Sequence, residues 1–431
     1  MKKIISVLLC LIFVFSPITI CADSIKTQIE TKENNQKILE NYMAYLDENL
    51  IEEKQPDGSI VVSLKPVMSG NANISAMSGN VYNSANTQDY TYTTGQKHTK
   101  LSITEKFLYT TLSDKQKEWY RKIDAVVNEL GEEVFFDGDS IVEDRNYYIY
   151  YIYMADNPEH FYLASTLTLS SHGDGTSSIK LKYAVGNKEG EWGSTAGDGS
   201  SDDLRQKIIA KKAIFDNKVN EIISTIPANA PEVIKEYLIY CKILLSSYYN
   251  LGAQWDGLAN DNWTAYGILV NGYGVCESYS EAFQTICHAV GINCTGVVGT
   301  AGGGHKWNAV KIEGEWYQCD ITFDDPVGGG ADNVYSNYFN LTDKEMTELS
   351  HDWSNCEWDV PICTATKYGR DSFFKFYERG DDGVVHHYSN GCDKFCDNCD
   401  YQRYADDHEY NDNSICINCG YGTENGWFNN S

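Results

Sequence analysis

Apolar side chains recur every three to four residues from Tyr279 to Val290, which is the spacing of one buried face of an α-helix. Gly274 precedes this pattern and breaks the element before it, and Gly291 follows as a left-handed stop. The pattern therefore predicts a helix that carries Cys276 in its first turn.

Two runs rich in Trp, Val, Ile and Tyr follow at residues 305–312 and 315–323, and they predict two strands. The Glu-Gly pair between them suits a tight two-residue turn, so the runs form a hairpin that pairs outward from this turn. Counting outward places His305 opposite Thr322. Asp320 is then a diagonal neighbour of His305 on the same face, at a Cβ distance of roughly 7 Å that the two side chains can bridge.

The same patterns predict an α+β protein. Ser113 and Gln116 resemble a capping box in front of a helix whose apolar face runs from Trp119 to Leu130. Asp261 is a candidate N-cap for a short helix ahead of Cys276. Further helices are predicted at 204–223 and 231–249, the latter burying Ile234, Leu238, Cys241 and Leu245, and strands are predicted at 147–153, 161–169 and 179–185.

Composition narrows the classes of partner. The chain of 431 residues has 34 Lys and Arg against 61 Asp and Glu, a net charge of -27. This balance argues against nucleic acid and against anionic membrane surfaces as partners. A peptide or protein substrate remains compatible with it, and the oligomeric state stays open.

The first 22 residues are typical of a secretory signal peptide. Two lysines precede an apolar run, a proline interrupts it, and Ala22 offers a small residue for cleavage. A lipid anchor on Cys21 is the weaker alternative, because Ile20 before it is bulky for such a site. No second apolar run approaches the length of a membrane span. We therefore expect a secreted, extracellular protein, free or held at the cell surface without a membrane helix.

Cys276, His305 and Asp320 are the candidate catalytic residues. The first turn of a helix favours the thiolate, which is the reactive form of cysteine, and its free amides can hold an oxyanion. The alternatives are a small buried Cys276, a structural His305, and Asp324 or Asp325 in place of Asp320. Outside the signal peptide, Cys276 and the tail, six cysteines remain and can pair completely, which leaves Cys276 free: Cys241, Cys287, Cys294, Cys319, Cys356 and Cys363.

The blocks GVCESYSEAF, GHKWNAVKI and WYQCDITFDDP together resemble the signature of the transglutaminase-like superfamily. Residues 264–272 resemble that family's lead-in helix, and residues 338–353 its exit segment. The resemblance implies a papain-like core in which Cys276 attacks an amide, His305 transfers the proton and Asp320 orients the imidazole. Hydrolysis and cross-linking both remain open. A non-catalytic surface protein that keeps the fold for binding or adhesion is the alternative of a different class.

The tail changes composition and is rich in cysteine and histidine. The pair Cys396 and Cys399 and the pair Cys416 and Cys419 have the spacing of a four-thiolate zinc ribbon, so we expect a structural zinc ion. Cys392 and His408 are substitutes for a missing ligand. The alternatives are disulfides, which persist outside the cell, and reduced thiols.

These observations predict five segments. They are a signal peptide at 1–22, a partly disordered arm or linker at 23–103, an α+β accessory domain at 104–229, a transglutaminase-like catalytic core at 230–380, and a zinc-binding module at 384–431. No cofactor is expected for catalysis itself.

Overall fold

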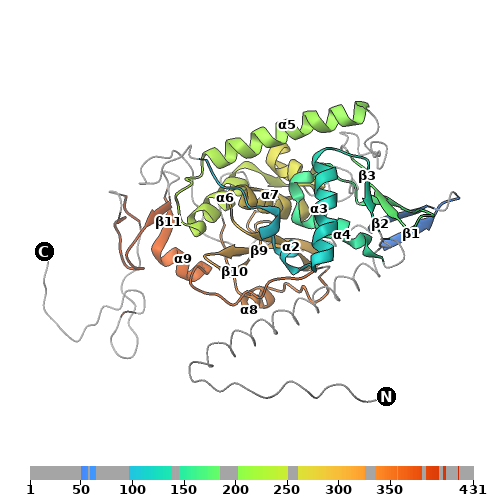
Figure 1. Cartoon of the computed structure of the whole chain (residues 1–431). Coiled ribbons are helices and arrows are strands. Elements are labelled where there is room, and N and C mark those ends of the chain that lie inside the picture. Colours follow the sequence, from blue (N-terminus) through green and yellow to red (C-terminus); the bar gives the residue numbers. More distant parts are fainter. Residues whose placement is uncertain are drawn as a thin grey trace, which may run out of the picture.

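A computed structural model describes residues 50–56, 59–64, 97–137, 141, 145–184, 202–250, 261–325, 335–356, 358–380, 385–397, 401–403 and 416. The predicted signal peptide lies outside the described residues, as does most of the predicted arm. In Figure 1, helix α5 (Asp202–Ser224) runs along one side of the molecule, strands β1 to β3 gather at one end, and α9 and β11 lie at the other.

An antiparallel five-stranded sheet forms the N-terminal part, in the order β1-β2-β4-β5-β3. Its strands are β1 (Leu50–Lys54), β2 (Ile60–Leu64), β3 (Glu133–Phe136), β4 (Thr166–Ser171) and β5 (Ser177–Lys180). Strands β1 and β2 come from the segment that the sequence assigned to an arm, and β2 pairs with β4. This part of the predicted arm therefore belongs to the five-stranded sheet.

Three helices pack against this sheet: α2 (Phe107–Thr111), α3 (Asp114–Asn128) and α4 (Ile149–Asp156). The predicted capping box is confirmed, because the Gln116 amide N–H is directed to Ser113 Oγ and the Ser113 N–H donates to Gln116 Oε1. The predicted strand at 147–153 is wrong, since these residues belong to a short 3-10 helix, Asn146–Tyr148, and to α4. All the tyrosines and isoleucines of this run are buried, so the helix has no polar face that its period could reveal.

The other two predicted accessory strands are shorter than expected. Strand β4 begins at Thr166, and β5 ends at Lys180. Beyond these ends, Leu163 and Tyr183 form one isolated antiparallel bridge.

The central sheet has the order β10-β9-β8 and consists of β8 (Cys294–Thr300), β9 (Gly304–Ile312) and β10 (Glu315–Cys319). Trp307 and Ala309 of β9 share a core with the N-terminal helices. Val310 and Ile312 belong to the core formed with α5, α6 (Glu232–Ser246) and α7 (Cys276–Ala289). The sheet is therefore covered on both faces, and packing from both sides holds β9 in position.

The predicted hairpin turn is confirmed. Glu313 and Gly314 have φ of 51° and 91°, and Ile312 pairs with Glu315. The outward count is wrong at its far end, because β10 ends at Cys319 opposite Asn308.

The remaining elements flank the core. They are the short parallel pair β6 (Tyr248–Tyr249) and β7 (Tyr273–Gly274), a 3-10 helix (Asp261–Trp263), a π-helical turn (Gly267–Asn271), α8 (Asp343–Glu348), α9 (Arg370–Phe376), β11 (Tyr377–Arg379) and β12 (Val385–His387). Two further 3-10 helices span Ile103–Glu105 and Pro158–His160. Asp261 begins the 3-10 helix, and its side chain pairs with Lys211.

The predicted helix at 231–249 is α6, in which Ile234 and Cys241 are buried while Leu238 and Leu245 are half-buried. Within the described residues, no helix has both the length and the apolar character needed to cross a membrane.

Candidate active site

Cys276 is the first residue of α7, as the sequence predicted. Gly274 lies two residues ahead, where a Cβ atom would come within 2.9 Å of the Asn262 carbonyl oxygen and closer still to Ser278 Oγ. The Val275 N–H donates to Ser278 Oγ at 2.8 Å and anchors the helix start. Because the first amides of a helix have no intrahelical acceptor, the thiol lies beside donors that can bind an oxyanion.

His305 and Asp320 meet by a route that differs from the predicted one. His305 pairs with Gly299 of β8, and Asp320 lies just past the end of β10. Even so, His305 Nε2 and Asp320 Oδ2 are 2.7 Å apart, and both side chains are buried. Asp320 Oδ1 accepts the N–H groups of Thr322 and Phe323 at 3.0 and 3.2 Å. The residue thus forms a tight turn that aims its carboxylate at the imidazole.

The electrostatics of this pair favour its charged form. Burial lowers the pKa of His305, but the Asp320 carboxylate and a hydrogen bond with the Cys276 side chain outweigh burial and raise the pKa to about 10. Burial likewise raises the pKa of Asp320, yet His305 and His351 hold it well below its usual range. Since Nε2 of His305 contacts Asp320, Nδ1 is the ring nitrogen left to interact with the Cys276 side chain. The imidazole therefore connects the thiol to the carboxylate, as proton transfer requires.

A second imidazole contacts the same carboxylate, which the sequence analysis did not foresee. His351 Nε2 lies 3.0 Å from Asp320 Oδ2, and His351 is 1% exposed. The next residue, Asp352, exchanges two backbone hydrogen bonds with Thr300 of β8, at 2.8 and 2.9 Å. The sequence signal for His351 is its place in the HDW motif at 351–353, at the end of the predicted exit segment.

Gly299 permits this docking of the exit segment. A Cβ atom at Gly299 would lie 2.3 Å from the Asp352 carbonyl oxygen and 2.7 Å from the Trp307 ring. A glycine next to Thr300 is therefore what lets the chain around His351 approach the sheet.

Aromatic rings cover the imidazole of His305. Phe323 and Trp307 stack on it with ring centroids 4.6 and 5.7 Å away. Trp307 is buried, and its Nε1–H donates to Gln318 Oε1 at 2.8 Å. Packing of this kind holds the imidazole in one orientation and limits the access of water.

An ion pair connects the helix to the strand beside the catalytic residues. Lys306, next to His305, is 2.7 Å from Glu277 and 3.4 Å from Glu281 on α7. Burial raises the pKa of Glu281 to about 7, because its effect is larger than the opposing attraction of Lys306. These contacts fix the distance between the thiol and the imidazole.

Asp324 and Asp325 have other roles than Asp320. Asp324 accepts from Tyr240 and from the N–H groups of Asn337 and Tyr338, and Asp325 accepts from Tyr279. Both carboxylates hold the loop in place, and Asp320 alone of the three contacts His305 among the described residues.

His305, Asp320 and His351 are also close enough to one another to hold a metal ion. Both Nε2 atoms, however, point at the same Asp320 oxygen at hydrogen-bond distance. Because a metal ligand must offer a lone pair to the ion, binding would require both contacts to break. The arrangement fits a hydrogen-bonded catalytic unit better than a metal centre.

Cys276 is a free thiol, and so are five of the six cysteines that the sequence would allow to pair: Cys241, Cys287, Cys294, Cys319 and Cys363. Those six are buried and act as small apolar residues. In the tail, Cys396 and Cys416 are described, whereas Cys399, Cys419 and His408 lie outside the described residues. Cys392 Sγ and Cys416 Sγ are 3.6 Å apart.

A thiol at a helix start, beside a histidine held by an aspartate, defines the class of cysteine-dependent papain-like sites. Residues 229–321 match the model of the transglutaminase-like superfamily. The chain therefore carries a transglutaminase-like core, as its sequence motifs indicated.

The chain is also similar to kyphoscoliosis peptidase of Homo sapiens and of Mus musculus, with 25% identity to each over 24% of this chain and 19% of the relative. It thus spans about a fifth of the length of these relatives. Among solved structures, a TGase shares 13% identity over 44% of this chain and 50% of its own, with a TM-score of 0.23. A candidate cysteine protease from Cytophaga hutchinsonii shares 15% over 39% and 65%, with a TM-score of 0.22.

Proposed function

We propose that this protein is a cysteine-dependent acyl-transfer enzyme that acts on peptide or protein amides. The Cys276 thiolate attacks the amide carbonyl, and the amides of the first turn of α7 stabilise the oxyanion. The His305 imidazolium protonates the leaving amine as the C–N bond breaks, which leaves a thioester on Cys276 and a neutral imidazole. His305 then removes a proton from water or from an acceptor amine, which attacks the thioester and releases the thiolate.

The observation that carries this proposal is the short contact between His305 Nε2 and Asp320 Oδ2, with the Cys276 side chain near enough to the same imidazole to raise its pKa. A structural histidine needs only one partner. Here a carboxylate lies on one side and a thiol on the other, which is the arrangement that a general base requires.

The test is to incubate the full chain with a peptide library and a labelled primary amine, and to identify acyl adducts by mass spectrometry. We expect an adduct on Cys276, and we expect Cys276→Ser and His305→Ala each to abolish turnover because the two residues act as a unit. Cys363→Ser is the matched control, since a serine hydroxyl can keep the contact that the Cys363 thiol makes with the Pro361 carbonyl. Release of free acid indicates a peptidase, and amine incorporation indicates a transglutaminase.

The alternative, a binding or adhesion protein, predicts neither product. If Cys276→Ser retains turnover, or if wild-type Cys276 forms no adduct and alkylates no faster than Cys363, the enzymatic proposal is wrong.

We also propose that the protein is secreted, on the strength of its N-terminal pattern. N-terminal sequencing of protein from the culture medium should start near residue 23. Protein found only in the cytoplasm with Met1 intact would contradict this.

We propose a structural zinc ion in the tail, held by thiolates from the set Cys392, Cys396, Cys399, Cys416 and Cys419. In support, the 3.6 Å between Cys392 Sγ and Cys416 Sγ is close to the edge of a tetrahedron with Zn–S bonds of about 2.3 Å, and far longer than a disulfide bond of about 2.05 Å. Metal analysis should find about one zinc per chain, lost in Cys416→Ser. A disulfide-linked tail without metal would overturn this.

A further inference from the structure

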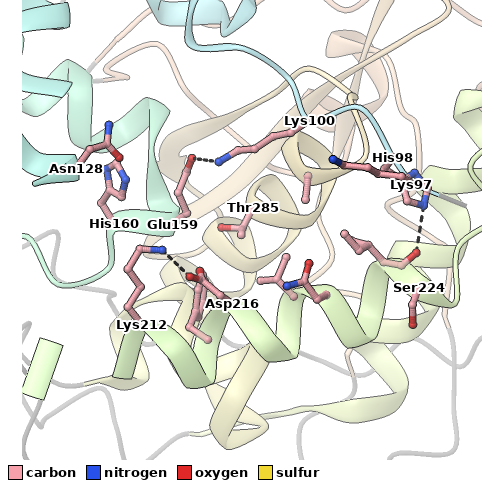
Figure 2. A pocket seen from close by; sticks show the side chains of 15 residues that line it. Lys97, His98, Lys100, Asn128, Glu159, His160, Lys212, Asp216, Ser224 and Thr285 are labelled. Atoms are coloured by element: carbon pink, nitrogen blue, oxygen red, sulfur yellow. Dashed lines mark hydrogen bonds and ion pairs between the residues drawn. The ribbon is translucent and has the colours of Figure 1, made fainter. Parts of the chain in front are cut away.

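A cavity lies away from the catalytic residues, between α5, the start of the 97–101 segment and the C-terminal half of α7. Its volume is about 480 Å³, and no member of the catalytic unit lines it. Thr285 of α7 lies nine residues beyond Cys276, roughly 14 Å along the helix axis at 1.5 Å per residue. Figure 2 shows Thr285 between Glu159 on one side and the side chains of α5 on the other. The cavity is therefore a separate site that shares only α7 with the active site.

The wall of this cavity is held in place by several contacts. The Leu101 N–H donates to the His288 carbonyl at 2.8 Å, and a Cβ atom at Gly291 would come within 2.7 Å of the Thr99 carbonyl oxygen. His98 Nε2 contacts the Ile223 and Ile226 carbonyls at 3.1 and 2.8 Å. The 97–101 segment is thus pinned to both α7 and the end of α5.

Three residues that line the cavity each have a buried polar atom without a hydrogen-bond partner among the described residues: Glu159 Oε2, Thr285 Oγ1 and His98 Nδ1. Thr285 is only 4% exposed. In the tautomer that donates from His98 Nε2 to the Ile223 and Ile226 carbonyl oxygens, Nδ1 is an acceptor. Leaving such groups unsatisfied is costly, so the set points to a ligand that offers O–H or N–H donors.

The rim of the cavity is cationic in a chain whose net charge is -27. Lys97, Lys100 and Lys212 line it together with Glu159 and Asp216, and Lys212 pairs with the Asp216 carboxylate at 2.6 Å. Lys100 and the buried Lys106 both contact Glu159 Oε1, at 3.2 and 3.0 Å, so this carboxylate is already neutralised. A smaller cavity of about 280 Å³ shares Lys97 and Lys100. The positive charge at the rim therefore favours an anionic group on the ligand.

We propose that this cavity binds a small organic acid that carries hydroxyl or amide donors. Its carboxylate lies at the rim with Lys97 and Lys100, its donors reach Glu159 Oε2 and His98 Nδ1, and a further polar group meets Thr285 Oγ1. The apolar part rests on Phe215 and Val219 of α5. A volume of 480 Å³ exceeds what an inorganic ion needs and falls in the range of small-molecule sites. A sugar acid and the C-terminal end of a peptide both have this chemistry.

Calorimetric titration of the full chain tests the proposal. The protein carries Cys276→Ser, so that no acyl transfer consumes a probe and the readout is independent of activity. The probes form matched pairs: galacturonate with galactose, and N-acetyl-alanyl-alanine with its C-terminal amide. We expect one acid to bind and its neutral counterpart to bind at least tenfold more weakly. Whichever acid binds identifies the source of the ligand.

Variants then locate the site. Lys97→Ala should weaken binding roughly tenfold and Thr285→Val roughly fivefold, as expected for one charged and one neutral hydrogen bond. Lys344→Ala, an exposed lysine of α8, is the matched control and should leave the affinity unchanged. Melting curves check that each variant is folded. Equal binding of acid and neutral probes, binding insensitive to Lys97→Ala and Thr285→Val, or no saturable binding by either acid would each overturn the proposal while leaving the proposed enzymatic function intact.

Discussion

Asp320→Asn is the sharpest test of the catalytic unit, because the carboxylate accepts from four N–H donors. Oδ1 accepts from the backbone of Thr322 and Phe323, and Oδ2 contacts the imidazoles of His305 and His351. An asparagine has one acceptor oxygen and can keep only one of these two pairs. If it keeps the backbone pair, its NH₂ group faces the two Nε2 atoms. His305 must then carry its proton on Nδ1, facing the thiol, where it can no longer accept one.

The size of the effect follows from the pKa of His305. This pKa is about 10, against an ordinary value of 6.5. Burial lowers it, and the Asp320 carboxylate is the largest of the contributions that raise it. At about 1.4 kcal/mol per pKa unit, the net shift favours the imidazolium by roughly 5 kcal/mol, and the carboxylate and Cys276 together supply it against burial. Allowing for relaxation around the amide, we expect Cys276 reactivity to fall roughly 1000-fold, less than the loss caused by Cys276→Ser.

The assay is the rate of Cys276 alkylation by iodoacetamide, followed by peptide mass spectrometry. At pH 6 an ordinary thiol is almost entirely protonated, so fast alkylation there reports the ion pair with His305. Asp352→Asn is the matched control, since this exposed carboxylate borders the site without contacting Cys276, His305 or Asp320. If Asp320→Asn alkylates at the wild-type rate at pH 6, the ion-pair account of this site is wrong.

The same pKa makes a prediction about folding. The His305 pKa is raised on folding, so its charge contributes stability that is fully present below about pH 6.5 and is lost as pH rises through about 10. Denaturation of wild type should show this loss between pH 6.5 and 10, and Asp320→Asn should lack it. An equal pH dependence in the two proteins would contradict the assignment.

Three further substitutions probe the supports of the site. His351→Leu should lower the alkylation rate at pH 6 roughly tenfold, whereas His351→Gln, whose amide can replace the Nε2 donor, should stay near wild type; equal effects would deny a positioning role. Gly299→Ala should cost about 2 kcal/mol in urea denaturation, while Gly173→Ala, which has open space around it, should be neutral. Lys306→Met should destabilise by about 3 kcal/mol at pH 8 and by less at pH 5, where Glu281 is protonated; a pH-independent loss would refute the contribution of the Lys306–Glu281 pair.

The parts of the site that the sequence predicted are those set by local signals. The glycine before Cys276 and the periodic apolar face behind it are enough to start a helix there. The Glu-Gly turn is enough to set the register of β9 against β10. Both signals act within a few residues, so contacts with distant parts of the chain have little effect on these two elements.

Most of the predictions that were wrong concern elements whose structure depends on contacts with distant residues. The tyrosine-rich run of α4 is buried on all sides, so its composition favoured a strand while its packing made a helix. Strands β1 and β2 are short and surrounded by polar sequence, and they join the sheet through residues far away in the chain, since β1 pairs with β2 and β2 pairs with β4. Strand β10 stops at Cys319 because Asp320 turns to bind its own backbone two and three residues on.

His351 shows why a three-residue description of this site is incomplete. A buried carboxylate stays ionised only if its lone pairs are satisfied, and three partners leave one acceptor position of Asp320 exposed to an apolar surrounding. The fourth partner comes 31 residues later, on a segment that reaches the sheet only because Gly299 has no side chain. Docking of that segment and ionisation of Asp320 are therefore coupled, and the imidazole of His305 depends on both. A sequence motif can name the three reacting residues, but the charge on the aspartate is fixed by where the exit segment packs.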